Sequence, residues 1–77
     1  TIKTEFSGDG DNYGCRAWCI DAESGERVQG PKVDWNMVKA EGWHKDKGTQ
    51  RSKWATMPDL MFVYRAASYL IRTNYPD

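Results

Sequence analysis

Residues 54–77 read WATMPDLMFVYRAASYLIRTNYPD, and this stretch decides the fold. Thr56 is a residue type that caps helix N-termini, Pro58 suits a first helical turn, and Asp59 completes an arrangement like a capping box. Apolar and small side chains then recur at helical spacing, which predicts one long C-terminal helix. The side expected to face the core consists of Leu60, Met61, Tyr64, Ala67, Ser68 and Ile71.

The same helix is also largely apolar on its other sides, which carry Phe62, Val63, Ala66 and Leu70. A helix that is apolar on most sides is usually covered on more than one side. We therefore expect an identical neighbour, or another part of a longer protein, to cover it.

The first third of the chain has the patterns of β-strands. Residues 2–6 alternate apolar and polar side chains, residues 7–12 are rich in turn formers, and a second strand is predicted over about residues 13–20. After a turn at 21–25, residues 26–29 could form a short third strand. One face of the second strand would carry Tyr13, Cys15, Ala17 and Cys19. These patterns predict a three-stranded antiparallel β-meander.

A short helix is predicted between the sheet and the long helix. Asp34 is a good N-cap, and Val33 and Val38 occupy the positions of a hydrophobic staple. Gly42 suits the residue that follows the last turn. The side chains expected to face the core are Trp35, Met37 and Val38. The predicted fold class is therefore α+β, with the meander followed by a short helix and a longer C-terminal helix.

Size and cysteine spacing bound the class of protein. A chain of 77 residues makes one small domain, here residues 1–77, and its ends suggest a fragment of a longer protein. No apolar run approaches the roughly 20 residues of a membrane span. Cys15 and Cys19 lie four apart in one predicted strand, so their Cα atoms would be roughly 13 Å apart, beyond disulfide reach. Reduced thiols favour a cytoplasmic protein.

Enzymatic and metal chemistry find little support in the sequence. Residues 9–14 resemble the start of a calcium loop, but Tyr13 and Ile20 stand where that loop needs ligands, so a hairpin turn is expected. His44, the one histidine, is expected to be an exposed loop residue, because no recognisable nucleophile motif accompanies it. We expect no enzyme, no metal and no cofactor.

Charge is balanced overall but unevenly distributed. The net charge is zero, with residues 1–26 carrying −4 and residues 27–77 carrying +4. Residues 43–53 form a polar and basic segment that is expected to be a flexible loop. Its basic or potentially basic side chains are His44, Lys45, Lys47, Arg51 and Lys53. With Trp43 and Trp54 at its ends, the loop has the ingredients for single-strand binding, namely cations for phosphates and rings for bases. The alternative is a solvated loop whose two tryptophans anchor it in the core.

A second candidate surface is on the long helix. Arg65, Tyr69 and Arg72 follow one another at i, i+4 and i+7 and would form a polar stripe that a ligand could use. The alternative is that the two arginines form salt bridges on the helix surface.

The C-terminal motif resembles the RecT/Redβ family of phage single-strand annealing proteins. The matching pattern is Trp54, Pro58 four residues later, Met61, Arg65-Ala66, Arg72, and the close Tyr75-Pro76-Asp77. The capped segment 34–43, DWNMVKAEGW, is similar too. This chain departs from many relatives at Asp59 and Leu60, where those carry basic residues.

The resemblance implies a function. Such proteins bind single-stranded DNA and annealing intermediates in homologous recombination, need no nucleotide cofactor, form homo-oligomers, and work with a phage exonuclease. A bacterial or prophage-encoded cytoplasmic protein would be expected. Carried over by position, the leading DNA contacts are Arg65 and Arg72, and the motif residues Trp54, Pro58, Met61 and Ala66 are structural. The full set of candidate DNA contacts is Arg65, Arg72, Lys53, Arg51, Lys47, Lys45 and Tyr69. Two alternatives stay open: a subunit-contact or protein-interaction module without DNA binding, and an unrelated protein-binding domain.

Overall fold

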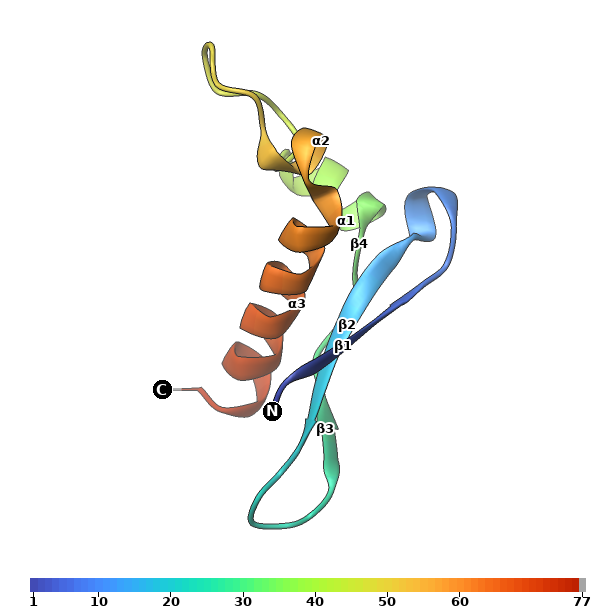
Figure 1. Ribbon diagram of the computed structural model, residues 1–77, viewed down its shortest axis with the longest axis vertical. Helices are drawn as coiled ribbons and strands as arrows, with labels where there is room; N and C mark the ends of the chain where they lie inside the picture. The colour runs from blue at the N-terminus through green and yellow to red at the C-terminus, as the bar shows by residue number, and fades with distance from the viewer. Residues whose placement is uncertain (77) are drawn as a thin grey trace.

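The computed structural model describes residues 1–76 and consists of an antiparallel sheet with one long helix lying across one of its faces (Figure 1). The elements, in chain order, are β1 (Lys3–Ser7), the 3-10 turn η1 (Gly10–Asn12), β2 (Gly14–Ile20), β3 (Arg27–Gln29), β4 (Val33–Asp34), α1 (Trp35–Glu41), α2 (Lys53–Thr56) and α3 (Pro58–Asn74). The predicted α+β class and the antiparallel meander are confirmed.

The sheet is built around β2, which pairs with every other strand. β1 lies along one edge, with Lys3 opposite Trp18 and Ser7 opposite Gly14. β3 and β4 lie one after the other along the second edge. Between them, residues 30–32 stand opposite only two residues of β2, which is the arrangement of a β-bulge. The second edge is therefore one bulged strand, of which the sequence predicted only the first half.

Two glycines allow the elements to approach one another closely. A Cβ on Gly14 would lie 1.9 Å from the carbonyl oxygen of Val33, and one on Gly30 would lie 2.8 Å from the Cα of Leu70. Gly14 therefore allows β4 to pack closely against β2, and Gly30 allows the backbone of α3 to contact the bulged strand directly.

The core lies between α3 and one face of the sheet. From the sheet come Cys15, Ala17 and Val33, each with no exposed surface. Both cysteines are free, as predicted. The helix side of the core consists of Phe62, Ala66 and Leu70, which are at most 1% exposed. Full burial of a side chain such as Phe or Leu stabilises the fold by about 1.5–3 kcal/mol.

The predicted core face of the long helix is wrong for Leu60, Tyr64 and Ile71, whereas Met61, from the same prediction, packs against the core. Leu60, Tyr64 and Ile71 are 43, 60 and 47% exposed, respectively. The face turned to the sheet is instead the one that the sequence placed elsewhere around the helix. Both sets have helical spacing, and the aromatic ring of Phe62 decides between them, because it packs edge-on against Trp35 and Trp54 with ring centroids 5.1 and 4.9 Å away.

The start of the long helix also differs from the prediction. Thr56 is not its N-cap; it is the last residue of α2, a separate short helix. The side chain of Ser52 caps α2 by accepting a hydrogen bond from the Trp54 backbone N–H, and α3 begins at Pro58. A proline in the first turn costs no hydrogen bond, because the backbone N–H that proline lacks would have no helical partner at that position. The hydroxyl of Tyr13 then ties α3 to the sheet by donating to Oδ1 of Asp59 at 3.0 Å.

The short helix α1 agrees with its prediction. The carboxylate of Asp34 accepts a hydrogen bond from the backbone N–H of Met37 at 3.0 Å. Gly42 ends the helix with a φ of 73°, a left-handed conformation that glycine adopts without strain. Val38 is fully buried, and Trp35 packs against the core.

The second face of the sheet has no helix on it within residues 1–76 (Figure 1). It carries the side chains that alternate with the buried ones, among them Glu5, Arg16 and Trp18. No helix in the described part of the chain is long and apolar enough to cross a membrane.

Candidate functional site

The basic segment between α1 and α2 folds into a small hairpin that projects from one end of the molecule (Figure 1). Lys47 and Gln50 exchange two backbone hydrogen bonds of 3.0 Å and close its tip. Ser52 closes its base, because its hydroxyl donates to the carbonyl oxygen of Trp43 at 2.8 Å and its backbone N–H donates to Oδ1 of Asp46 at 2.8 Å. The segment expected to be a flexible loop therefore has a defined hydrogen-bonded path.

Asp46 is the one acid in the hairpin, and its role is structural. Its carboxylate accepts the Ser52 backbone N–H, while no ion pair joins it to a lysine or arginine within residues 1–76. The neighbouring cations therefore keep their charge available to a ligand.

A stack of side chains links the hairpin to α3. The rings of Trp43 and Trp54 lie nearly parallel at 17°, with their centroids 5.8 Å apart. The guanidinium of Arg65 lies over the Trp43 ring, with Cζ 4.0 Å from the ring centroid. This contact is a cation–π interaction, and it fixes the arginine at the mouth of the site.

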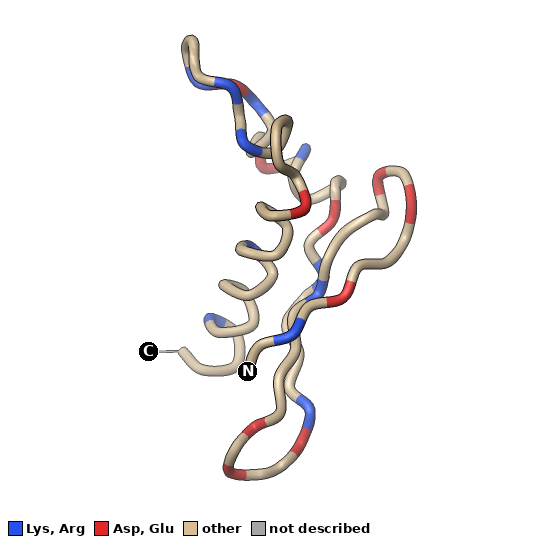
Figure 2. Tube along the Cα trace, in the orientation of Figure 1, with Lys and Arg blue, Asp and Glu red and all other residues tan. Residues whose placement is uncertain are grey.

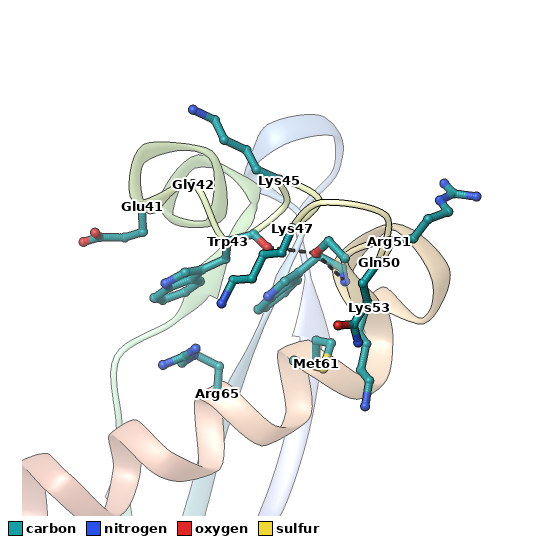
Figure 3. A pocket seen from close by; sticks show the side chains of 12 residues that line it. Glu41, Gly42, Trp43, Lys45, Lys47, Gln50, Arg51, Lys53, Met61 and Arg65 are labelled. Atoms are coloured by element: carbon teal, nitrogen blue, oxygen red, sulfur yellow. Dashed lines mark hydrogen bonds between the residues drawn. The ribbon is translucent and has the colours of Figure 1, made fainter.

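A hollow of about 530 Å³ lies beneath the hairpin, beside this stack (Figure 3). Its cationic lining residues are Lys45, Lys47, Arg51, Lys53 and Arg65. The one acid among the lining residues is Glu41. In Figure 3 the ends of the Lys47 and Arg65 side chains lie near the Trp43 ring, Lys47 coming from the hairpin and Arg65 from α3, whereas Lys45 and Arg51 extend outward. A phosphate chain passing over the hollow could contact the inner pair and then the outer pair.

Five of the seven predicted DNA contacts thus come together, and two do not. Arg72 is exposed on α3 two turns beyond Arg65, or roughly 10 Å along the axis, and does not line the hollow. Tyr69 packs against the hydrophobic core, so the predicted polar stripe is interrupted at its middle. The alternative of salt bridges on α3 finds no support, because the ion pairs in the described structure are Arg27–Glu5 and Lys39–Asp11.

The alternative explanation, in which the two tryptophans anchor the loop in the core, holds in part. Trp54 is 3% exposed and belongs to the core, so it offers no ring to a base. Trp43 is half-buried, and Arg65 covers one of its faces. A base could stack there only by displacing the arginine. The site therefore offers cations for phosphates, and it offers little exposed aromatic surface for bases.

Several residues of the site escaped the sequence interpretation. Gln50 and Ser52 line the hollow and hold the hairpin, and Met61 forms part of its floor. A signal for Ser52 was present, since a serine one residue before a short helix is a preferred N-cap. His44, expected to be exposed, is half-buried, and its Nδ1 is buried without a hydrogen-bond partner.

The geometry excludes some chemistry for the described residues. Within residues 1–76, no three His, Cys, Asp or Glu side chains lie together where they could hold a metal ion. Burial raises the pKa of the Cys15 thiol above its usual value, so the protonated, unreactive form is favoured. Comparison with known proteins gave no match to a family model, to a curated protein or to a solved structure.

Proposed function

We propose that this chain binds single-stranded DNA along the basic hollow between the hairpin and α3, as the DNA-binding part of a phage-type protein that anneals complementary strands without a nucleotide cofactor. The observation that carries the proposal is the meeting of five cations, from two separate segments, around one hollow with a single acid. Phosphate neutralisation by Lys and Arg supplies most of the affinity of sequence-independent binding.

The scarcity of exposed rings sets the mode of binding. Arg65 and Lys47 would hold the backbone of one strand, and the bases would stay turned away from the protein. Bases held in this way remain open to a complementary strand, as annealing requires. Binding should then show little sequence preference, because contacts to phosphate carry no sequence information.

Fluorescence anisotropy with a labelled oligothymidylate tests the proposal through its salt dependence. For single strands, log K falls against log salt with a slope of about −0.7 per phosphate contact, so five contacts give a slope of about −3.5. The double variant Lys47→Gln/Lys53→Gln should reduce the steepness by about 1.4. Both lysines are exposed, so neither change should disturb folding.

Lys39→Gln is the matched control, because Lys39 is exposed and its ion pair with Asp11 lies away from the hollow. It makes the same type of charge change but should leave the slope as it was. A flat salt dependence between about 50 and 500 mM would contradict the proposal. Equal effects of control and site variants would place the DNA elsewhere.

A second candidate function, a subunit contact, is favoured by one observation on α3. Its outward side carries Leu60, Tyr64, Ala67 and Ile71, and with Met57 just before the helix they form an apolar stripe with alternating spacings of three and four residues. This spacing is typical of helices that pair with another helix. In an antiparallel pair of two copies, Leu60 would face Ile71, and Tyr64 would face Ala67. Sedimentation equilibrium tests it: self-association that persists at high salt and is lost in Leu60→Asp supports this role.

A further inference from the structure

The uncovered face of the sheet carries a second hollow, of about 340 Å³, far from the hairpin in the sequence. Its lining residues are Glu5, Phe6, Ser7, Arg16 and Lys32. Arg16 comes from the central strand, and Lys32 comes from the bulge between β3 and β4. None of these residues lines the hollow beneath the hairpin.

Arg16 has hydrogen-bonding capacity that the described structure leaves unused. Its Nε is buried and has no hydrogen-bond partner, and no carboxylate within residues 1–76 pairs with its guanidinium. A buried donor without a partner costs free energy, so native structures rarely keep one unless a ligand, an ion or water satisfies it.

The acid nearest in register to Arg16 is already engaged. Glu5 stands directly opposite Arg16 in the β1–β2 pair, yet its Oε1 accepts a hydrogen bond from Nη2 of Arg27 at 3.0 Å. Arg27 is held in turn over the Trp18 ring, with Cζ 4.2 Å from the centroid. The negative charge of Glu5 is therefore balanced by Arg27, so it does not compensate the positive charge of Arg16.

The bulge places a second cation beside the first. Lys32 is half-buried and forms no ion pair in the described part of the chain. Its ammonium lies against the turn after β1, since a Cβ on Gly8 would come within 3.0 Å of Nζ. The hydroxyl of Ser7 lines the same hollow and is a further donor.

From this arrangement we propose that Arg16, Lys32 and Ser7 form a phosphate-binding site on the outer face of the sheet. An arginine presents parallel N–H donors to two oxygens of such a group, and a lysine adds a point charge. The ligand chemistry is a phosphate group, either free or in a phosphodiester chain. The site is distinct from the hollow beneath the hairpin and does not depend on the function proposed for it.

Heteronuclear NMR tests this site directly, because it resolves the Arg16 Nε–Hε signal in a chain of this size. Inorganic phosphate should shift that signal and the Ser7 and Lys32 amides along one saturable curve. Lys32→Gln should weaken the apparent affinity about tenfold, which is the effect of removing one charge-assisted contact. Arg16→Lys, which keeps the charge but loses the paired donors, should weaken it as well.

Lys3→Gln is the matched control, since Lys3 projects from the same sheet face but does not line the hollow. It should leave the phosphate affinity unchanged. An oligothymidylate titration then identifies the source of the phosphate group. If the oligonucleotide shifts the Arg16 signal and Lys32→Gln abolishes this shift, the ligand is a phosphodiester. If the oligonucleotide causes no shift at Arg16, the ligand is a small free phosphate. Shifts that rise linearly with concentration, or that appear equally at Lys3, would overturn the proposal. A failure of the hairpin variants in the anisotropy assay would leave this result unaffected.

Discussion

Replacing Leu70 and Ile71 by alanine, one at a time, tests which face of α3 forms the core. The two residues are neighbours in the chain and lose similar side chains. Leu70 is 1% exposed, whereas Ile71 is 47% exposed. The structure therefore predicts opposite outcomes for two changes that the sequence alone would rank the other way.

The magnitude for Leu70→Ala follows from its surroundings. Three carbon atoms leave the core, at about 0.8 kcal/mol each, which gives roughly 2.4 kcal/mol for the transfer alone. The cavity adds to this cost when the surroundings cannot close in. Here they cannot, because the backbone of α3 at Leu70 already touches Gly30. We expect a loss of about 3–4 kcal/mol in the free energy of unfolding. Ile71→Ala should change it by less than about 0.5 kcal/mol.

Urea unfolding followed by circular dichroism measures both values. In thermal unfolding of a domain of this size, the midpoint temperature of the Leu70 variant should lie about 12–30 °C below that of the wild type. Its urea m-value should stay the same if the change acts on packing alone. A cost for Ile71→Ala that equals or exceeds the cost for Leu70→Ala would refute the assignment of the core face.

Three further outcomes follow from the fold. Asp34→Ala should cost about 1 kcal/mol because the N-cap bond to Met37 is lost, and Asp34→Asn should restore most of it in the same urea assay. Gly30→Ala should cost about 1–3 kcal/mol, since the new Cβ would lie 2.8 Å from the Cα of Leu70; a neutral result would mean that helix and strand are not in contact there. The raised pKa of Cys15 means that the folded state keeps its proton longer than the unfolded chain does, so this contribution is present below about pH 9 and is lost as pH rises through the folded pKa. Urea midpoints taken at increasing pH should therefore fall on the alkaline side, and Cys15→Ala should flatten that fall.

The local patterns were sufficient to predict β1, β2, β3 and α1, whereas β4 was missed. Alternation in the second strand correctly placed Cys15 and Ala17 on the buried face, and the pair Asp34 and Gly42 marked both ends of α1. These signals depend on a residue and its close neighbours, so no long-range information was needed.

The orientation of α3 required such information. Two sets of residues on this helix have helical spacing, and the pattern within the helix led to the choice of the set that contains Ile71. The choice depends on which set fits the rest of the molecule: Phe62 fits among the rings of Trp35 and Trp54, and Leu70 fits against Gly30. Neither contact can be read from α3 itself.

The candidate site was predictable in composition but not in arrangement. The basic character of residues 43–53 is evident from the sequence, and so is the presence of Arg65. Their meeting depends on the fold, which brings Trp43 beneath the guanidinium of Arg65. Arg72 lies two helical turns beyond Arg65, so its separation from the hollow depends on where the hairpin ends along α3. The inward turn of Tyr69 follows from the rotation of α3, which the sequence did not determine.

The placement of charge along the molecule has a consequence for the speed of encounter. The turn between β2 and β3, which is mainly acidic, lies at one end of the long axis, and the basic hairpin lies at the other, along an extent of 46 Å (Figure 2). The chain is thus neutral in sum, but its two ends carry opposite charge, although further acids lie in the turn between β1 and β2 (Figure 2). In dilute salt, where screening extends over about 30 Å, this separation of charge should turn the hairpin toward an approaching polyanion before contact. At physiological ionic strength, charges are screened beyond about 8 Å, so an approaching polyanion no longer senses the two ends together. Encounters should then become slower and less selective in orientation.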